Sequence, residues 1–245
     1  MRGGGNSQAI GGGSTIGGGA YNNTSGDFAT IDGGDANSAS GFESTIGGGT
    51  GNFATGEAST VVGGSGNSAD GDEGTFMWAD STNADFFSDG PNRFLVRASG
   101  GTAIYSDVGL TMGVTLVSGG SAWAAVSDRN LKENFAEVDT RAVLDRLAET
   151  PITTWNYKSQ NDAIRHMGPM GQDFYAAFGI GEEETRITTI DADGVALAAI
   201  QGLHQIVQEK ECELDELRKE KHALAERLAA LERSVAGLLN RKKGD

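Results

Sequence analysis

Two residues near the middle of the chain have the types and spacing of a catalytic pair. Ser127 is followed by Lys132 within the hexapeptide Ser-Asp-Arg-Asn-Leu-Lys. A serine hydroxyl is a poor nucleophile until a base removes its proton, and a neutral lysine amine can be that base. The amine is neutral near pH 7 only if burial or nearby positive charge lowers the lysine pKa from about 10.4. The same residues also describe an ordinary serine–aspartate turn or helix cap beside a solvated lysine.

Three further segments follow this hexapeptide in a fixed order. They are a Trp155-x-Tyr157 strand, the segment His-Met-Gly-Pro-Met-Gly-Gln-Asp-Phe from His166 to Phe174, and Asp-Gly-Val-Ala-Leu at the start of a long helix. Together the four motifs resemble the endosialidase-type intramolecular chaperone domain, an auto-processing peptidase at the ends of phage tail fibres. The resemblance covers about residues 126–215. Met167 and Gly171 depart from that pattern, where Ile and Ala are common.

The resemblance implies a mechanism for particular residues. Ser127 and Lys132 form the catalytic dyad, and the bond that is cut lies between Val126 and Ser127. Cleavage is expected only after the fold, and the oligomer with it, has formed around the lysine. Supporting candidates either orient the dyad, donate to an oxyanion, or simply satisfy hydrogen bonds within the fold; they are Asp128, His166, Gln172 and Asp173.

A fifteen-residue repeat occupies the first third of the chain. Its glycines do not recur at every third residue, which excludes collagen. A flexible Gly/Ser linker is the alternative, but a linker has no reason to keep one large apolar residue in phase. We therefore expect a β-solenoid in which Thr-Ile is a short strand and Gly and Asn form turns. The columns are Thr15, Thr30, Thr45, Thr60 and Thr75; Ile16, Ile31, Ile46, Val61 and Phe76; Asn22, Asn37, Asn52 and Asn67; and Gly26, Gly41, Gly56 and Gly71.

Each coil of this solenoid has few large apolar side chains. Burying one of them contributes about 1.5–3 kcal/mol, whereas ordering each backbone residue costs about 1–2 kcal/mol. We therefore expect several chains to join around an axis and bury the isoleucine column between them. The repeats resemble the head of trimeric autotransporter adhesins, a left-handed parallel β-roll that also occurs in phage fibres. That resemblance covers about residues 14–76 and implies a homotrimer that binds a host-surface receptor or glycan.

Residues 76–126 are richer in aromatic side chains. The segments FLVRA at 94–98 and TAIYS at 102–106 are typical of strands. We expect a small β-domain here that connects the repeats to the C-terminal part. Its aromatic residues either pack in a core or form a platform for carbohydrate.

A regular heptad pattern begins at residue 200 and predicts a coiled coil. Its two seam columns are Ile200, Val207, Leu214, Lys221, Leu228 and Val235, and Leu203, Lys210, Leu217, Leu224, Leu231 and Leu238. Val or Ile in the first column with Leu in the second favours dimers, while both resemblances imply trimers. We expect a trimer, because three-fold symmetry must hold along the whole axis. The alternative is a single amphipathic helix packed on its own domain.

Composition excludes several other functions. The formal net charge is −15, and the first 126 residues contain three basic residues, Arg2, Arg93 and Arg97. Nucleic-acid binding needs clustered Lys and Arg, so nucleic acid is not an expected partner. The single cysteine, Cys212, permits no disulfide within the chain. The sequence predicts no signal peptide, membrane span, metal or cofactor.

The sequence predicts a mainly β chain followed by an α+β part. The expected domains are a β-roll head (1–75), a β-rich connector (76–126), a chaperone and auto-processing domain (127–199) and a trimerisation helix (200–240). The expected protein is a trimeric fibre on a virion tail or in an extracellular or cell-surface location, and its chaperone domain removes itself. One alternative is a surface adhesin that keeps its C-terminal stalk uncut. A polysaccharide-degrading tailspike is another, but no paired carboxylates stand out in the repeats.

Overall fold

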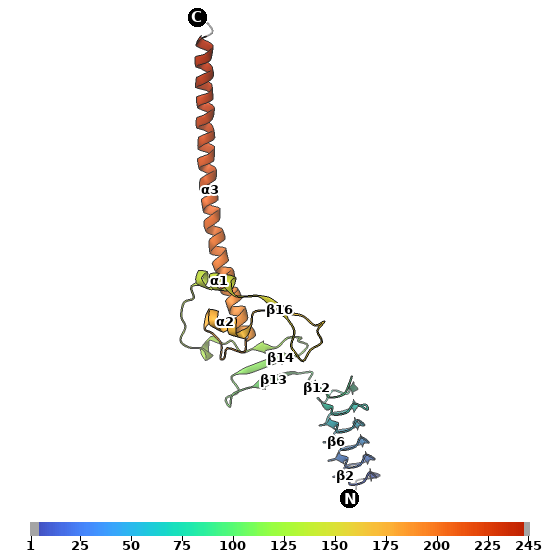
Figure 1. Ribbon diagram of the computed structural model, residues 1–245. Helices are drawn as coiled ribbons and strands as arrows, with labels where there is room; N and C mark the ends of the chain where they lie inside the picture. Colours follow the sequence, from blue (N-terminus) through green and yellow to red (C-terminus); the bar gives the residue numbers. More distant parts are fainter. Residues whose placement is uncertain (1–4, 243–245) are drawn as a thin grey trace. The chain divides into compact units, whose positions relative to one another are not determined.

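The structure is a computed structural model that describes residues 5–242, with the side chains of the last helix described through Val235. The chain divides into two compact units, Met1–Glu133 and Asn134–Asp245. Figure 1 shows the order of the elements along the chain.

The first unit begins as a β-solenoid of about six turns. Successive strands alternate between two parallel six-stranded sheets, ordered β1-β3-β5-β7-β9-β11 and β12-β10-β8-β6-β4-β2. A short strand and a turn rich in Gly and Asn make each half-coil, as the repeat predicts. The strands are β1 (Gln8–Ala9), β2 (Thr15–Ile16), β3 (Asn23–Thr24), β4 (Thr30–Ile31), β5 (Ser38–Ala39), β6 (Thr45–Ile46), β7 (Phe53–Ala54), β8 (Thr60–Val61), β9 (Asn67–Ala69), β10 (Phe76–Ala79), β11 (Phe86–Phe87) and β12 (Phe94–Arg97).

The strand register follows the fifteen-residue columns as far as Val61 and then shifts by one residue. Ile46 pairs with Val61, but Val61 pairs with Met77, and Phe76 pairs with Thr60. The expectation that Phe76 continues the isoleucine column is therefore wrong. Ala69 still pairs with Ala54, so the extra residue lies in the turn that follows β9.

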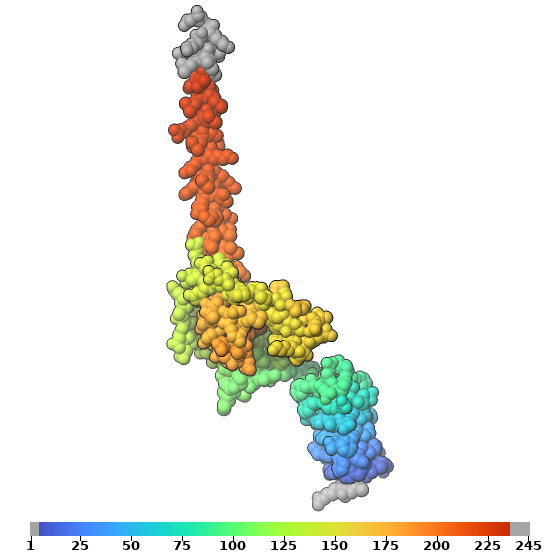
Figure 2. All heavy atoms as spheres, viewed as in Figure 1, coloured from blue at the N-terminus to red at the C-terminus, as the bar shows by residue number. Residues whose placement is uncertain are grey.

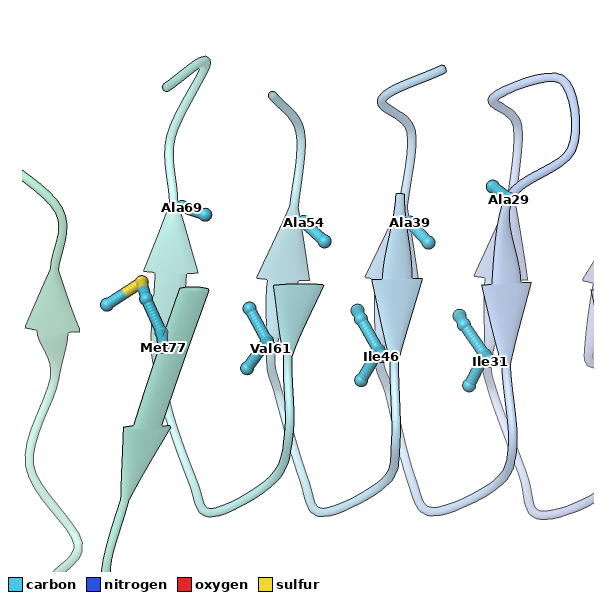
Figure 3. Close-up of a cluster of buried hydrophobic side chains, with 8 residues drawn as sticks. All are labelled: Ala29, Ile31, Ala39, Ile46, Ala54, Val61, Ala69 and Met77. Atoms are coloured by element: carbon cyan, nitrogen blue, oxygen red, sulfur yellow. The ribbon is translucent and has the colours of Figure 1, made fainter. Parts of the chain in front are cut away.

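The core of the solenoid lies between its two sheets. Ile31, Ile46, Val61 and Met77 form one buried column, which faces an alanine column from the other sheet, Ala39, Ala54 and Ala69 (Figure 3). All seven side chains are fully buried within the single chain. The expectation that several chains are needed to bury the isoleucine column is therefore wrong. The small alanines let two sheets of one chain close over it.

A ladder of buried asparagines runs along the turns of the coils. Asn52 donates its backbone N–H to Asn37 Oδ1 at 3.0 Å, and its side-chain amide donates to the carbonyl oxygens of Gly48 (2.9 Å) and Gly64 (3.1 Å). Asn67 repeats this contact by donating its backbone N–H to Asn52 Oδ1 at 3.1 Å. Each amide thus links turn groups of neighbouring coils and gives its own buried donors partners.

The solenoid continues past the expected head boundary at residue 75, because β10, β11 and β12 extend the same two sheets. The strand expected at 94–98 is β12, the last rung of the solenoid, and the strand expected at 102–106 is β13. A three-stranded antiparallel sheet follows, in the order β13-β14-β15. Its strands are β13 (Gly101–Tyr105), β14 (Gly113–Val117) and β15 (Ala124–Ala125), and the 3-10 turn η1 (Arg129–Leu131) comes after them.

The second unit combines helices with a short hairpin. Its elements are α1 (Thr140–Glu149), β16 (Thr153–Trp155), β17 (His166–Gly168), α2 (Gly171–Phe178) and α3 (Thr189–Lys242). β16 and β17 pair antiparallel, and α1 packs on α3. Gly202 allows that close approach, because a Cβ there would lie 2.4 Å from the Thr140 carbonyl oxygen. Arg141 of α1 also forms an ion pair with Glu209 of α3.

The distal part of α3 is exposed along its described length. Every described residue from Val207 to Val235 is exposed, including its leucines. In the view of Figure 2 the orange-to-red part of this helix stands clear of the rest of the unit. Within the described residues, no helix is both long enough and apolar enough to cross a membrane.

Candidate active site

The bond expected to be cut lies directly after the last strand of the antiparallel sheet. β15 pairs with β14 through Ala124 and Ala125. Val126 follows, half-buried, and its backbone N–H donates to the Gly113 carbonyl oxygen at 3.3 Å. The chain on the N-terminal side of the bond is therefore held at the edge of a sheet.

On its C-terminal side the bond leads into the η1 turn. Asp128 is the N-cap of this turn, and its Oδ1 accepts hydrogen bonds from the Asn130 backbone N–H (2.9 Å) and side-chain amide (3.0 Å). Aspartate is a preferred cap because its carboxylate satisfies N–H groups that a helical turn leaves free. Lys132 leaves the turn in an extended conformation, with φ −121° and ψ 149°, and its N–H donates to the Arg129 carbonyl oxygen.

The turn brings the two candidate catalytic side chains together. The Lys132 ammonium donates a hydrogen bond to Ser127 Oγ at 2.8 Å, which is within reach for proton transfer. Both residues are exposed in the single chain. A lysine acts as a base only in its neutral form, which burial favours. The geometry of a serine–lysine pair is thus present, and both side chains are open to solvent among the described residues of their own unit.

His166 lies on β17 of the second unit and is engaged within its hairpin. It pairs with Trp155 of β16, and the two rings lie 4.9 Å apart. Its Nε2 is 3.0 Å from Gln160 Oε1. These contacts show how the hairpin holds the imidazole, and a role for His166 in cleavage stays a prediction.

Gln172 and Asp173 lie in the first turn of α2, and both are exposed. A carboxylate near the N-terminus of a helix is stabilised by the helix dipole, which gives Asp173 a structural reason for its position. Gln172 lines a hollow of the second unit together with Trp155, Tyr157 and Arg186. The structure therefore groups Ser127, Asp128 and Lys132 around η1, and it describes His166, Gln172 and Asp173 within the other unit.

Sequence reasoning missed two residues that hold the chain around the candidate site. Asn130 completes the cap made by Asp128, and a polar residue two positions after a capping aspartate was the available signal. Gly113 accepts the bond from Val126, and a Cβ at Gly113 would lie 2.2 Å from the Ile104 carbonyl oxygen. A glycine at the start of a strand signals such a close backbone approach. Among the described residues, no cluster of three His, Cys, Asp or Glu side chains could hold a metal ion.

Comparison with known families identifies the segment that contains this site. Residues 127–180 match a peptidase family model described as chaperone of endosialidase. The match begins at Ser127, directly after the expected cleavage bond, and includes every candidate site residue except Val126. The solenoid and the whole of α3 lie outside the match. Neither the curated proteins nor the solved structures contain a match to the chain.

Proposed function

We propose that this chain is a tail-fibre-like protein whose C-terminal part assembles three copies and then cuts itself off between Val126 and Ser127. The observation that carries the proposal is the 2.8 Å contact between Lys132 Nζ and Ser127 Oγ. It occurs at the first residue of the segment that matches the chaperone of endosialidase family. The proposed place of action is a virion tail or another extracellular surface.

The cleavage chemistry uses the two residues that the η1 turn brings together. Neutral Lys132 takes the proton of Ser127 Oγ, and the oxygen attacks the carbonyl carbon of Val126. The peptide C–N bond breaks, and the Ser127 nitrogen takes up a proton to become a free amine. Val126 is then held to Ser127 Oγ by an ester. Water adds to this ester and releases the Val126 carboxylate and the Ser127 hydroxyl.

The distal part of α3 supplies the surface for assembly. Its described heptad leucines are about half exposed or more, although a solvated helix has no reason to keep an apolar stripe in heptad register. Lys210 and Lys221 interrupt the stripe, and Lys210 pairs with Glu213 at 2.7 Å on the same helix. Leu238, the last expected seam residue, lies outside the described side chains. A parallel coiled coil of three α3 helices would bury this stripe.

Assembly and cleavage are coupled through the surroundings of Lys132. The dyad is exposed in one chain, so we infer that neighbouring copies cover it and remove water from the amine. Cleavage then reports a correctly assembled trimer. After the C-terminal fragment leaves, the fibre keeps its fold kinetically, because the element that aligned the three chains is gone.

The chaperone role is tested by comparing two routes to the same fragment. Residues 1–126 released from the full chain should sediment as a trimer, whereas residues 1–126 expressed alone should give monomers or aggregates. Sedimentation equilibrium of both samples at equal concentration measures the difference. If the fragment expressed alone forms the same trimer in the same yield, the C-terminal part does not act as a chaperone.

A further inference from the structure

A narrow slot opens on the outer face of the solenoid, over strands β7, β9 and β11. Phe53 pairs with Ser68, and Ser68 pairs with Phe87, so an aromatic side chain stands on each side of one serine. Phe53 is 45% exposed and Phe87 61%, whereas Ser68 between them is 7% exposed. These residues line a shallow cavity of about 340 Å³. The slot therefore has two apolar walls and a polar floor.

The repeat is broken where this slot forms. A strict fifteen-residue repeat would place Asn83 beside Ser68, but Phe87 pairs with it instead. The longer connection before β11 thus brings a second aromatic wall into register with Phe53. The two preceding strands of the sheet carry Ser38 and Asn23 at the equivalent position, so no such pair forms there. The slot is a local departure from the repeat.

The spacing of the walls suits one six-membered ring. Adjacent strands lie about 4.8 Å apart, so the two phenylalanine backbones are about 9.5 Å apart. Carbon atoms in contact lie about 3.5–4.0 Å apart. One saturated six-membered ring fits between the two side chains with both of its faces covered.

The polar groups of the slot have free hydrogen-bonding capacity. Ser68 is more than nine-tenths buried, yet its hydroxyl forms no hydrogen bond with any described residue, and it lines the slot. Asp70 and Asp85 line the slot as well, both exposed, and neither carboxylate has a hydrogen-bond or ion-pair partner among the described residues. A Cβ on Gly66 would lie 2.9 Å from Asp85 Oδ1, so that carboxylate lies over the glycine of the floor.

We propose that this slot, defined by Phe53, Ser68, Asp70, Asp85 and Phe87, binds one ring of an uncharged saccharide. A sugar ring offers apolar C–H faces to the two aromatic walls and hydroxyl donors at its rim to the serine and the carboxylates. No basic side chain lines the slot, and its two carboxylates repel acidic sugars. The proposal rests on the fibre function above and names the ligand class that the fibre would recognise.

Variants of the two walls test the slot without disturbing the coil. Phe53→Ser and Phe87→Ser each place the residue that neighbouring strands already carry at this position, as Ser38 and Ser68. Phe42→Ser is the matched control. Phe42 is 43% exposed and lies outside the slot, and the next coil carries the polar Glu57 at its equivalent position.

The experiment measures binding of the full chain to immobilised neutral hexose and N-acetylhexosamine oligosaccharides beside uronic-acid and sialylated counterparts. We expect a neutral oligosaccharide to bind, and both wall variants to weaken that binding by about tenfold or more. The Phe42→Ser control should bind as the wild type does, and acidic oligosaccharides should show no binding that depends on the two walls. Binding of no neutral sugar, or binding that both wall variants retain, overturns the proposal. So does dissociation of the oligomer by Phe53→Ser, which would make the slot an interface between copies.

The same samples are weighed by intact-mass spectrometry, so that the two proposals are judged separately. Chains that cleave but bind no neutral sugar contradict the saccharide slot alone. Chains that bind through the slot but never cleave contradict the self-processing function alone.

Discussion

The Lys132 ammonium lies 2.8 Å from Ser127 Oγ, and the two residues are joined by one short turn. The pair therefore depends on local structure, which Asp128 holds by capping η1, and it needs no distant part of the fold to form. Both side chains are exposed in the single chain. Under the proposed function, assembly adds a covered environment for the amine, since the distance is already set.

The first prediction concerns the base. Lys132→Arg keeps the positive charge and much of the reach of the side chain, but arginine cannot give up its proton in a protein. Cleavage should slow by about 10²–10⁴-fold, the usual contribution of a general base. A time course by intact mass measures the rate, with Lys158→Arg as the matched control. An arginine variant that cleaves at the wild-type rate would exclude Lys132 as the base.

The second prediction concerns the exposed stripe of α3. Leu217→Asp places a charge in the expected seam, where it would be buried in the coiled coil, so we expect both the trimer and the cleavage to be lost. Lys219→Asp introduces the same side chain on the outer face of the helix and should change neither. Sedimentation velocity and intact mass read out the two effects. Normal assembly of the Leu217 variant would show that the stripe is not the seam.

The third prediction concerns the asparagine ladder. Asn52→Ala removes the acceptor of the Asn67 N–H and the donor to two glycine carbonyls. Leaving the buried Asn67 N–H without its acceptor costs about 1–3 kcal/mol, so the variant should unfold at clearly lower denaturant concentration, although the Gly64 carbonyl keeps its bond from the Thr50 N–H. Asn23→Ala is the control, because Asn23 Oδ1 is buried and has no hydrogen-bond partner among the described residues. Equal destabilisation by both variants would contradict the role of the ladder.

The fourth prediction concerns acid sensitivity of the β13–β14 hairpin. The Asp107 carboxylate accepts a hydrogen bond from the Met112 N–H at 2.8 Å and another from the Thr111 hydroxyl at 2.8 Å. These two bonds, the Met112 bond most, hold the pKa of Asp107 below its ordinary value of 3.8. Because the pKa is lower in the folded state, the ionised carboxylate stabilises the hairpin fully at pH values above 3.8. This stabilisation is lost as the pH falls through the folded-state pKa.

Amide hydrogen exchange measures this effect. Protection factors of Thr111 and Met112, corrected for intrinsic exchange, should fall below about pH 4 in the wild type. In Asp107→Asn they should be lower at neutral pH and show little dependence on pH. The same acid-induced loss in both proteins would mean that another group is responsible.

The repeat could be predicted from the sequence because one apolar residue recurs in phase in every coil. The shift after β9 could not, since Thr75-Phe76 imitates the Thr-Ile pair and Met77 is equally apolar. Only strand pairing shows that Met77 continues the buried column. The need for several chains in the core was wrongly inferred, because the alanine columns allow the two sheets of one chain to meet.

The sequence likewise predicts one part of the candidate sites and leaves another part to strand register. Ser127 and Lys132 are close in sequence, so their spacing alone predicts that a turn can join them. Phe53 and Phe87 meet across Ser68 only because the connection before β11 is longer than the repeat. Partners of this kind depend on register, and a sequence pattern with an irregular period does not fix register.

The most direct test of the account is intact-mass spectrometry with N-terminal sequencing of the purified chain beside Ser127→Ala. The wild type should give two fragments, residues 1–126 and 127–245, with Ser127 as the new N-terminus. The variant should stay whole, while Ser159→Ala, an exposed serine of the hairpin loop, should cleave normally. A wild-type chain that stays whole, or one cut at another bond, would contradict self-processing at Val126–Ser127 and favour an adhesin that keeps its C-terminal stalk.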